Sequence, residues 1–413
     1  MVRAIGYKKM YEVSLALMAF LMLVVPKLVT IGIVLHLGVT VYGIVKRKLE
    51  FGINPLNVLF FLLYVAYLIG VFFTDHPDIA QKYLEYKLAL VVFPLLFSFK
   101  MKEEVSLKLP SIGLFAGVIV LMILGFINST FYFLETHSYS AFLSGRFSYI
   151  HHPTYFAVFA FVGMLLIQYA KEQGWFGTKK WVYPVLLVVM IIGQILSISM
   201  AGVLVLFLYI AVMVLKWILR RFGKIPFLAV LVISPVILLL IISKAPGLKT
   251  QFETSKKFVV EYVKDPIAFI EVDQTYVQGD ETRLIMWTVA ALEFSEYPMG
   301  VGTGNVDERL DNRLLTYGQV DVASHDYNPH NQFLQTAVEI GWIGLLIFIG
   351  IIAYVLFIGF KFKSVLITFI GINLAFNSLF ESMLQRQSGI VFYVFWMCLI
   401  TLVLLKNKRK SNS

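Results

Sequence analysis

Long apolar runs separated by short basic segments are the feature that most constrains this chain. The runs are about 17 to 25 residues long, and a helix of about 20 apolar residues spans the roughly 30 Å hydrocarbon core of a bilayer. Hydrophobic residues make up 59% of the 413 residues and charged residues 15%, whereas soluble domains have about half and about a quarter. The chain is therefore predicted to be an all-α polytopic membrane protein.

The apolar runs predict about 12 transmembrane helices with one large loop late in the chain. Their ranges are about 11–25, 28–45, 55–73, 84–99, 110–134, 152–170, 181–199, 200–219, 226–243, 333–359, 364–381 and 389–405. The chain then divides into residues 1–243 with helices 1–9, residues 244–332 as the large loop with short helices, and residues 333–413 with helices 10–12 and a basic tail. Loops of this length in a membrane domain are usually functional, because a plain connector needs only a few residues.

Lysines and arginines are concentrated in alternate connectors, such as residues 46–48 and 406–410, on the side of the N-terminus. The positive-inside rule therefore predicts that both termini are cytoplasmic and that the large loop is extracytoplasmic. The formal net charge is +10, but the sequence has no nucleic-acid-binding motif, so we expect no nucleic-acid partner. The single cysteine, Cys398, excludes an intramolecular disulfide.

One helix of the large loop is predicted to begin near Asp280, a suitable N-cap, and to end at Pro298. Arg283 lies in its first turn, and Trp287 follows four residues later on the same face. The N–H groups at a helix start attract phosphate, and a guanidinium matches phosphate oxygens with two donors. Arg283 is thus a candidate phosphate ligand, with a solvated surface arginine as the alternative.

A second helix start lies at residues 328–334, which read NPHNQFL and lead into the apolar run from Phe333. Asn328 is predicted to cap this helix, Pro329 to take its first position and His330 to lie in its first turn. The positive end of a helix disfavours imidazolium, so His330 is expected to be neutral and able to accept a proton. It is our candidate general base, with an ordinary loop histidine as the alternative.

Four other residues on the outer face are weaker candidates for substrate binding. Arg146 lies just before a span, where it can bind a phosphate or anchor a lipid headgroup. The last outer turn, Glu381 to Arg386, can face the site or form an ion pair between two spans, and His152 shares this face. Gly302 belongs to a G-x-G-x-G turn, which is weak evidence of phosphate binding and also fits a plain tight turn.

Other kinds of site have little support in the sequence. Arg309 and Arg313 alternate with acidic residues and are predicted to form a salt-bridged helix surface. No H-E-x-x-H, CxxC or aspartate-rich motif accompanies the histidines, so we expect no metal and no cofactor. A serine hydrolase is not expected either, because the chain lacks G-x-S-x-G.

Two groups of residues resemble the O-antigen ligase and O-antigen polymerase family of bacterial inner membranes. One is the segment 329–334 (PHNQFL) followed by 339–344 (EIGWIG), which is similar to the family's proline–His–Asn segment and the helix after it. The other is Arg283 with Trp287 and the glycine turn at 298–302 (PMGVG), which resembles the family's arginine helix. The layout of twelve spans with one late outer loop also resembles this family.

The resemblance implies metal-independent glycosyl transfer at the periplasmic face of the inner membrane. The donor would be a glycan on undecaprenyl diphosphate, and the acceptor a hydroxyl of lipid A–core or of a second lipid-linked glycan. His330 corresponds to the family's catalytic histidine, and Arg283 to the arginine that holds the diphosphate. Asn331 and Gln332 follow His330 in the motif and are further candidates for substrate binding.

One position departs from the family pattern, since many members have an arginine where this chain has Met200. Arg146 is hypothesised to replace this second cation from a neighbouring loop. Ligase, polymerase and protein O-oligosaccharyltransferase share the same donor, and ligation to lipid A–core is the preferred prediction. A polysaccharide transporter and a non-catalytic assembly protein are alternatives of other classes, but the chain shows no clear internal repeat and its charges collect at the outer face.

Overall fold

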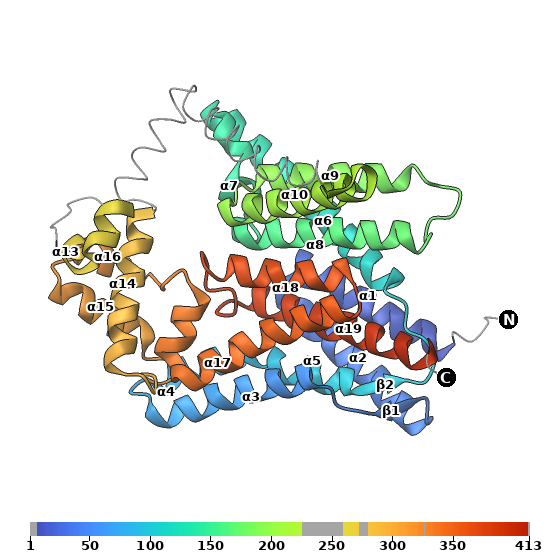
Figure 1. The fold of residues 1–413 in the computed structure, drawn as a ribbon, viewed down its shortest axis with the longest axis horizontal. Helices are drawn as coiled ribbons and strands as arrows, with labels where there is room; N and C mark the ends of the chain where they lie inside the picture. The colour runs from blue at the N-terminus through green and yellow to red at the C-terminus, as the bar shows by residue number, and fades with distance from the viewer. Residues whose placement is uncertain (1–5, 225–258, 272–279, 326, 412–413) are drawn as a thin grey trace.

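The computed structural model describes residues 6–224, 259–271, 280–325 and 327–411, and this part of the chain is mostly helical (Figure 1). In chain order the helices are α1 (Tyr7–Val24), η1 (Pro26–Leu28), α2 (Val29–Val45), α3 (Pro55–Gly70), η2 (Val71–Phe73), α4 (Pro77–Lys87), α5 (Ala89–Ser98), α6 (Lys108–Thr136), η3 (Tyr139–Phe142), α7 (Ser144–Phe147), α8 (Pro153–Glu172), α9 (Val182–Leu196), α10 (Met200–Phe222), α13 (Pro266–Ile270), α14 (Asp280–Glu296), α15 (Val306–Thr316), α16 (Val320–Ala323), α17 (Gln332–Lys361), α18 (Val365–Asn377) and α19 (Gln387–Ser411). Two short strands, β1 (Leu49–Phe51) and β2 (Phe99–Met101), pair antiparallel.

Seven helices of the described part are long and apolar enough to cross a membrane, and the shorter apolar helices α9 and α18 accompany them. One predicted span, 226–243, lies outside the described residues. Each of the other eleven predicted ranges overlaps a described helix, although the range 84–99 is divided between α4 and α5. The all-α class therefore agrees with the structure, whereas the number of 12 spans stays a prediction.

The helices lie roughly side by side in two groups (Figure 1). One group contains α6, α8, α9 and α10, and the other contains α3, α5, α17, α18 and α19. Helix α1 packs against α6 and so connects the groups. Both termini lie at one end of the bundle, and α13, α14, α15 and α16 gather at the opposite end. The large loop thus builds a separate helical cap at the end far from the termini.

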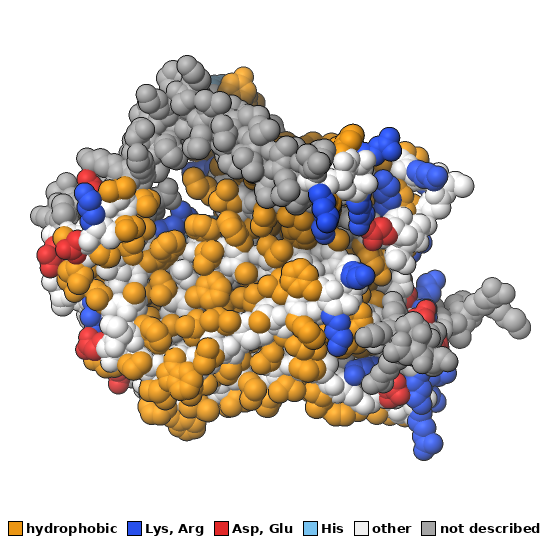
Figure 2. Space-filling view, in the orientation of Figure 1, with side chains coloured by type: hydrophobic (Ala, Val, Ile, Leu, Met, Phe, Trp, Pro, Cys, Tyr) orange, Lys and Arg blue, Asp and Glu red, His pale blue; other side chains and the backbone are white. Residues whose placement is uncertain are grey.

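A broad apolar surface covers the middle of the bundle on the face seen in Figure 2. Figure 2 shows hydrophobic side chains over most of this face, with lysines and arginines gathered mainly at the end that holds the termini. Large side chains such as Phe72, Val45 and Phe207 are 83%, 71% and 64% exposed. Apolar patches of this extent are rare on soluble monomers and belong against lipid. The chain is therefore a multi-pass membrane protein.

Helix α17 is broken where a glycine turn of the large loop inserts against it. Ile340 and Gly341 leave the helical conformation, and Gly341 has a φ of 71°. The N–H groups of Val301 and Gly302 donate to the carbonyls of Val338 (2.8 Å) and Glu339 (3.1 Å). The predicted span 333–359 therefore corresponds to α17, which is broken at Ile340 and Gly341, where the freed carbonyls pair with the inserted turn.

Substituting alanine for Gly341 is expected to destabilise the fold by about 1–3 kcal/mol, because a left-handed non-glycine residue is strained there. A Cβ at this position would also lie 2.4 Å from the Met299 carbonyl carbon. Thermal unfolding of the detergent-solubilised protein measures the effect. Gly350→Ala is the control on the same helix, since its Cβ would meet only Leu59, at 3.7 Å; equal melting temperatures for both variants would contradict the expectation.

Helix α14 has its own apolar contacts with the rest of the cap and with α17. Ile285, Met286, Val289 and Ala290 are all fully buried, and their spacing places them on one face of the helix. They belong to a core cluster that includes Val338 of α17. This packing fixes the start of α14, and with it Arg283, relative to the first half of α17.

Candidate functional site

Residues 328–332, which we call the His330 segment, join the large loop to α17. Asn331 caps that helix. The Asn331 Oδ1 accepts hydrogen bonds from the N–H groups of Phe333 (2.9 Å) and Leu334 (3.1 Å). The Asn328 Oδ1 instead accepts one from the His330 N–H, at 2.8 Å, in a tight turn. The predicted cap at Asn328 and the predicted place of His330 in the first helical turn are therefore wrong. The second asparagine satisfies the free N–H groups, so the helix begins later.

His330 lies just before this cap in a left-handed backbone conformation, with a φ of 46°. Pro329 consequently lies outside the helix as well. Left-handed backbone costs a residue with a side chain about 1–2 kcal/mol, and strained residues of this kind cluster at functional sites. His330 still immediately precedes the N-cap of α17, at the positive end of the helix dipole.

A carboxylate, Glu381, brings two histidines together in the outer turn (residues 378–386) between α18 and α19. His330 Nδ1 is 3.5 Å from Glu381 Oε2, and His152 Nδ1 is 3.9 Å from the same oxygen. The Glu381 side chain is only 6% exposed, whereas those of His330 and His152 are 24% and 39% exposed. We call these three residues the His330 cluster: a buried carboxylate behind two histidines that reach the surface.

Two arginines act electrostatically on the His330 cluster. Burial raises the pKa of Glu381, but the neighbouring histidines and Arg386 outweigh it and hold this pKa below its ordinary value. Burial lowers the pKa of His152, and although Glu381 opposes this, nearby cations that include Arg283 lower it further. The structure therefore brings Arg386, His152 and His330 around one ionised carboxylate, with Arg283 close enough to act on His152.

Hydrogen bonds fasten the outer turn to the His330 segment. Ser382 Oγ donates to Asn328 Oδ1 at 3.0 Å, and the Leu384 N–H donates to Gln332 Oε1 at 2.6 Å. The Gln332 N–H donates in turn to the Ser378 carbonyl at 2.8 Å. Gln332 thus links the two segments, and its contact with substrate stays a prediction, as does that of Asn331.

Arg283 lies in the first turn of α14, as predicted, and is half-buried. Trp287 follows one turn later, with its ring centroid 6.4 Å from that of Phe380, the residue before Glu381. Asp280 begins α14, but the side chain proposed as the N-cap lies outside the described part. The first turn of α14 and the outer turn are therefore neighbours.

Arg146 contacts an aromatic ring of α6. It belongs to α7, is exposed, and its guanidinium lies 4.3 Å from the ring centroid of Tyr132 in α6. Met200 begins α10 and is 68% exposed, with the Ser199 Oγ accepting from the Gly202 N–H at 3.2 Å. The replacement of a missing cation at Met200 by Arg146 remains a hypothesis.

His151, the neighbour of His152, holds helices together. Its Nε2 donates to the Leu23 carbonyl at 2.6 Å, so its Nδ1, 2.9 Å from Ser388 Oγ, accepts from that hydroxyl. Burial lowers the pKa of His151, although the Leu23 carbonyl opposes this.

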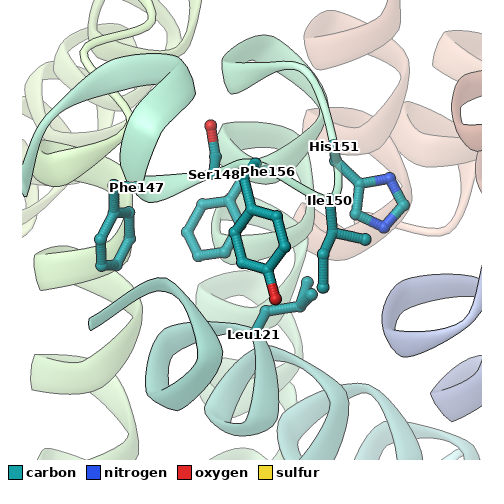
Figure 3. A pocket seen from close by; sticks show the side chains of 7 residues that line it. Leu121, Phe147, Ser148, Ile150, His151 and Phe156 are labelled. Atoms are coloured by element: carbon teal, nitrogen blue, oxygen red, sulfur yellow. The ribbon is translucent and has the colours of Figure 1, made fainter. Parts of the chain in front are cut away.

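In Figure 3, Phe147 and His151 lie on opposite sides of a small pocket. The pocket is lined by Leu121, Phe147, Ser148, Tyr149, Ile150, His151 and Phe156.

The glycine turn and the arginines of α15 have structural contacts. The Gly302 N–H is occupied by the Glu339 carbonyl, which favours the tight-turn alternative over phosphate binding. Arg309 and Arg313 form the predicted salt bridges, but their shared partner is the buried Glu293 of α14, at 2.8 and 2.5 Å. These ion pairs tie α14 to α15 within the cap.

A buried ion pair between Lys87 and Glu339 was missed in the sequence. Lys87 Nζ is 3.5 Å from Glu339 Oε1, and the two side chains are 1% and 0% exposed. Both charges fall within predicted spans, and a charge in an apolar span normally has a partner or a function. Each charge could therefore have been noticed in the sequence. The pairing could not, because no sequence pattern relates two residues so far apart in the chain.

The described residues contain no group of three or more His, Cys, Asp or Glu side chains placed to hold a metal ion. Proton transfer and anion binding are the chemistry that the described cluster can supply, since it offers histidines, a carboxylate and arginines. Metal-independent chemistry stays a prediction.

The fold and the site together define a multi-pass membrane protein with an acid–base and arginine cluster at the end that carries the loop helices. The family model described as O-antigen ligase matches residues 185–349, which include Arg283 and His330. This match confirms the resemblance predicted from the sequence motifs. It supports glycosyl transfer of the O-antigen ligase or polymerase type, with a lipid-linked glycan and an acceptor as partners. No match was found among curated proteins.

Proposed function

We propose that this protein transfers a glycan from undecaprenyl diphosphate to a hydroxyl of lipid A–core at the periplasmic face of the bacterial inner membrane. The observation that carries this proposal is the His330 cluster, beside Arg283 and Arg386, at the end of the bundle away from the termini. Lysines and arginines gather at the other end (Figure 2), and by the positive-inside rule that end is cytoplasmic.

His330 is the proposed general base. Its Nδ1 faces the carboxylate of Glu381, which leaves Nε2 as the nitrogen that takes the proton from the acceptor hydroxyl. A carboxylate behind a histidine orients the ring and stabilises the imidazolium that forms. The separation of 3.5 Å is compatible with this role, because catalytic hydrogen bonds are often long before the substrate binds.

Arg283 is the proposed ligand of the diphosphate. As the acceptor oxygen bonds to the anomeric carbon of the donor sugar, the bond from that carbon to the phosphate oxygen breaks, and undecaprenyl diphosphate leaves with the electron pair. A guanidinium beside the leaving oxygen stabilises the charge that develops there. Arg386 lies near enough to the cluster to contribute a second positive charge.

A glycolipid gel of a deletion strain tests the reaction. Loss of all long glycan from lipid A–core, with lipid-linked polymer accumulating, is the result expected for a ligase. Core that carries a single repeat would instead indicate a polymerase. Normal glycan on lipid A–core would contradict both, and a block in export with transfer intact in isolated membranes would indicate transport.

Arg146→Ala tests the hypothesis of a substitute cation. If Arg146 binds the diphosphate in place of the arginine absent at Met200, its loss should lower transfer about 100- to 1,000-fold, as expected when a group that stabilises the developing charge is removed. Transfer is measured in membranes with equal protein levels, with Arg283→Ala as the reference for a lost phosphate ligand. Unchanged transfer in Arg146→Ala would show that Arg146 only stacks on Tyr132.

A further inference from the structure

The Lys87–Glu339 ion pair belongs to a buried network that reaches the outer turn. Lys87 Nζ donates to Gln385 Oε1 at 2.6 Å, and Gln385 Nε2 donates to Glu339 Oε2, also at 2.6 Å. Gln335 Nε2 lies 3.4 Å from the same carboxylate oxygen. The Gln385 amide therefore bridges both charges, and it is the member of the network that belongs to the outer turn.

The aromatic surroundings of Lys87 favour a fixed charge. Its Nζ lies 4.4 Å from the ring centroid of Tyr67 and 5.0 Å from that of Tyr83. Cation–π contacts of this kind strengthen when they are desolvated. The ammonium is thus held by three different elements, α3, α4 and α17, together with the outer turn.

The outer turn is consequently held by two sets of hydrogen bonds. Ser382 and Leu384, which are both buried, are bonded to the His330 segment. Gln385 is bonded to the Lys87–Glu339 pair. Glu381 lies in this turn, so a shift of the turn changes the distance between its carboxylate and His330.

Stability alone is a poor explanation for this network. Bringing two charges out of water costs several kcal/mol per ion, and replacing a buried pair with apolar residues is often neutral or stabilising. The network also adjoins the break in α17, since the Glu339 carbonyl accepts from the Gly302 N–H and Gly341 follows two residues later. The network therefore lies where the first half of α17 is attached to the rest of the bundle. This half of the helix directly follows Asn331, the neighbour of His330.

We propose that Lys87, Glu339 and Gln385 are positioning residues, which hold the outer turn so that Glu381 faces His330. The inference rests on the proposed function, because it assigns these residues to the same transfer reaction. None of them contacts the cluster's histidines directly; they act through the backbone of the turn. The network thereby sets the distance between the Glu381 carboxylate and His330, on which the orientation of the imidazole depends. Misplacement of a catalytic group by about 1 Å costs up to about 100-fold in rate.

Gln385→Met tests the inference most directly, because it keeps the side-chain length and the charge pair but removes both bridging hydrogen bonds. We expect kcat for glycan transfer to fall about 10- to 100-fold, with little change in KM for the donor. The acidic limb of the pH–rate profile should move to higher pH, because a displaced Glu381 loses part of the contact with His330 and His152 that holds its pKa below its ordinary value. Gln81→Met, which changes an exposed glutamine of α4, is the matched control.

A second variant guards against misfolding of the first. Lys87→Met/Glu339→Gln removes both charges together, leaves no unpaired ion, and is expected to keep normal abundance with the same loss of kcat. Full activity in both variants, or a loss of activity that only follows reduced thermal stability with an unchanged pH profile, would overturn the inference. His330→Ala in the same assay separates the two proposals: if that variant stays active, the proposed mechanism fails and the positioning role fails with it.

Discussion

His330→Ala is expected to lower glycan transfer about 100- to 10,000-fold, the range typical for removal of a general base. The substitution removes the nitrogen that takes the acceptor proton and leaves Glu381 without its closest histidine, 3.5 Å away. Transfer is measured with purified protein in detergent or proteoliposomes, using lipid-linked glycan and lipid A–core as substrates. Binding of the donor should persist, because Arg283 is untouched.

The control for this variant is His137→Ala. His137 is exposed, ends α6, and has a φ of 53°, close to the 46° of His330. Alanine therefore meets a similar backbone cost at both positions, but only one lies in the His330 cluster. Wild-type activity in His330→Ala at normal abundance would refute the general-base role, and equal losses in the two variants would trace the effect to backbone strain.

Glu381→Gln is expected to lower kcat about 10- to 100-fold and to change its pH dependence. The neighbouring cations outweigh burial and hold the pKa of Glu381 below its ordinary value, so the carboxylate is ionised throughout the neutral range. Its contribution to stability is present above the ordinary pKa and is lost as the pH falls through the lowered value. Glutamine keeps the shape but cannot ionise, so the loss of rate that the wild type shows as the pH falls through the lowered pKa of Glu381 should be absent from the variant.

Rate profiles of the wild type, Glu381→Gln and Glu135→Gln provide the measurement. Glu135 is an exposed glutamate near the end of α6, so its neutralisation changes the net charge by the same amount without touching the cluster. A profile for Glu381→Gln that overlays those of the other two would mean that the carboxylate does not act on the base.

The sequence predicted the helical architecture well, because apolar runs of membrane-spanning length have few other folds available. The ranges 110–134 and 152–170 differ from α6 and α8 by only a few residues at either end. It did not predict the break at Gly341 within the span 333–359. Glycine in an apolar run is common in membrane helices, and nothing local shows that a distant turn will occupy the freed carbonyls.

For the candidate site, the sequence supplied the individual residues but not their arrangement. The sequence was enough to order the spans and to choose His330 and Arg283 as candidate site residues. Both steps used residue types, helix-start patterns and the distribution of charge, which are properties of single segments. Only the tertiary structure decided that Glu381 stands behind His330, that Asn331 caps α17 in place of Asn328, and that Lys87 pairs with Glu339. These contacts join residues that are far apart in the chain, or depend on which of two asparagines, three residues apart, reaches the free N–H groups. They are set by how helices pack against one another, and no periodicity along a single segment encodes that packing.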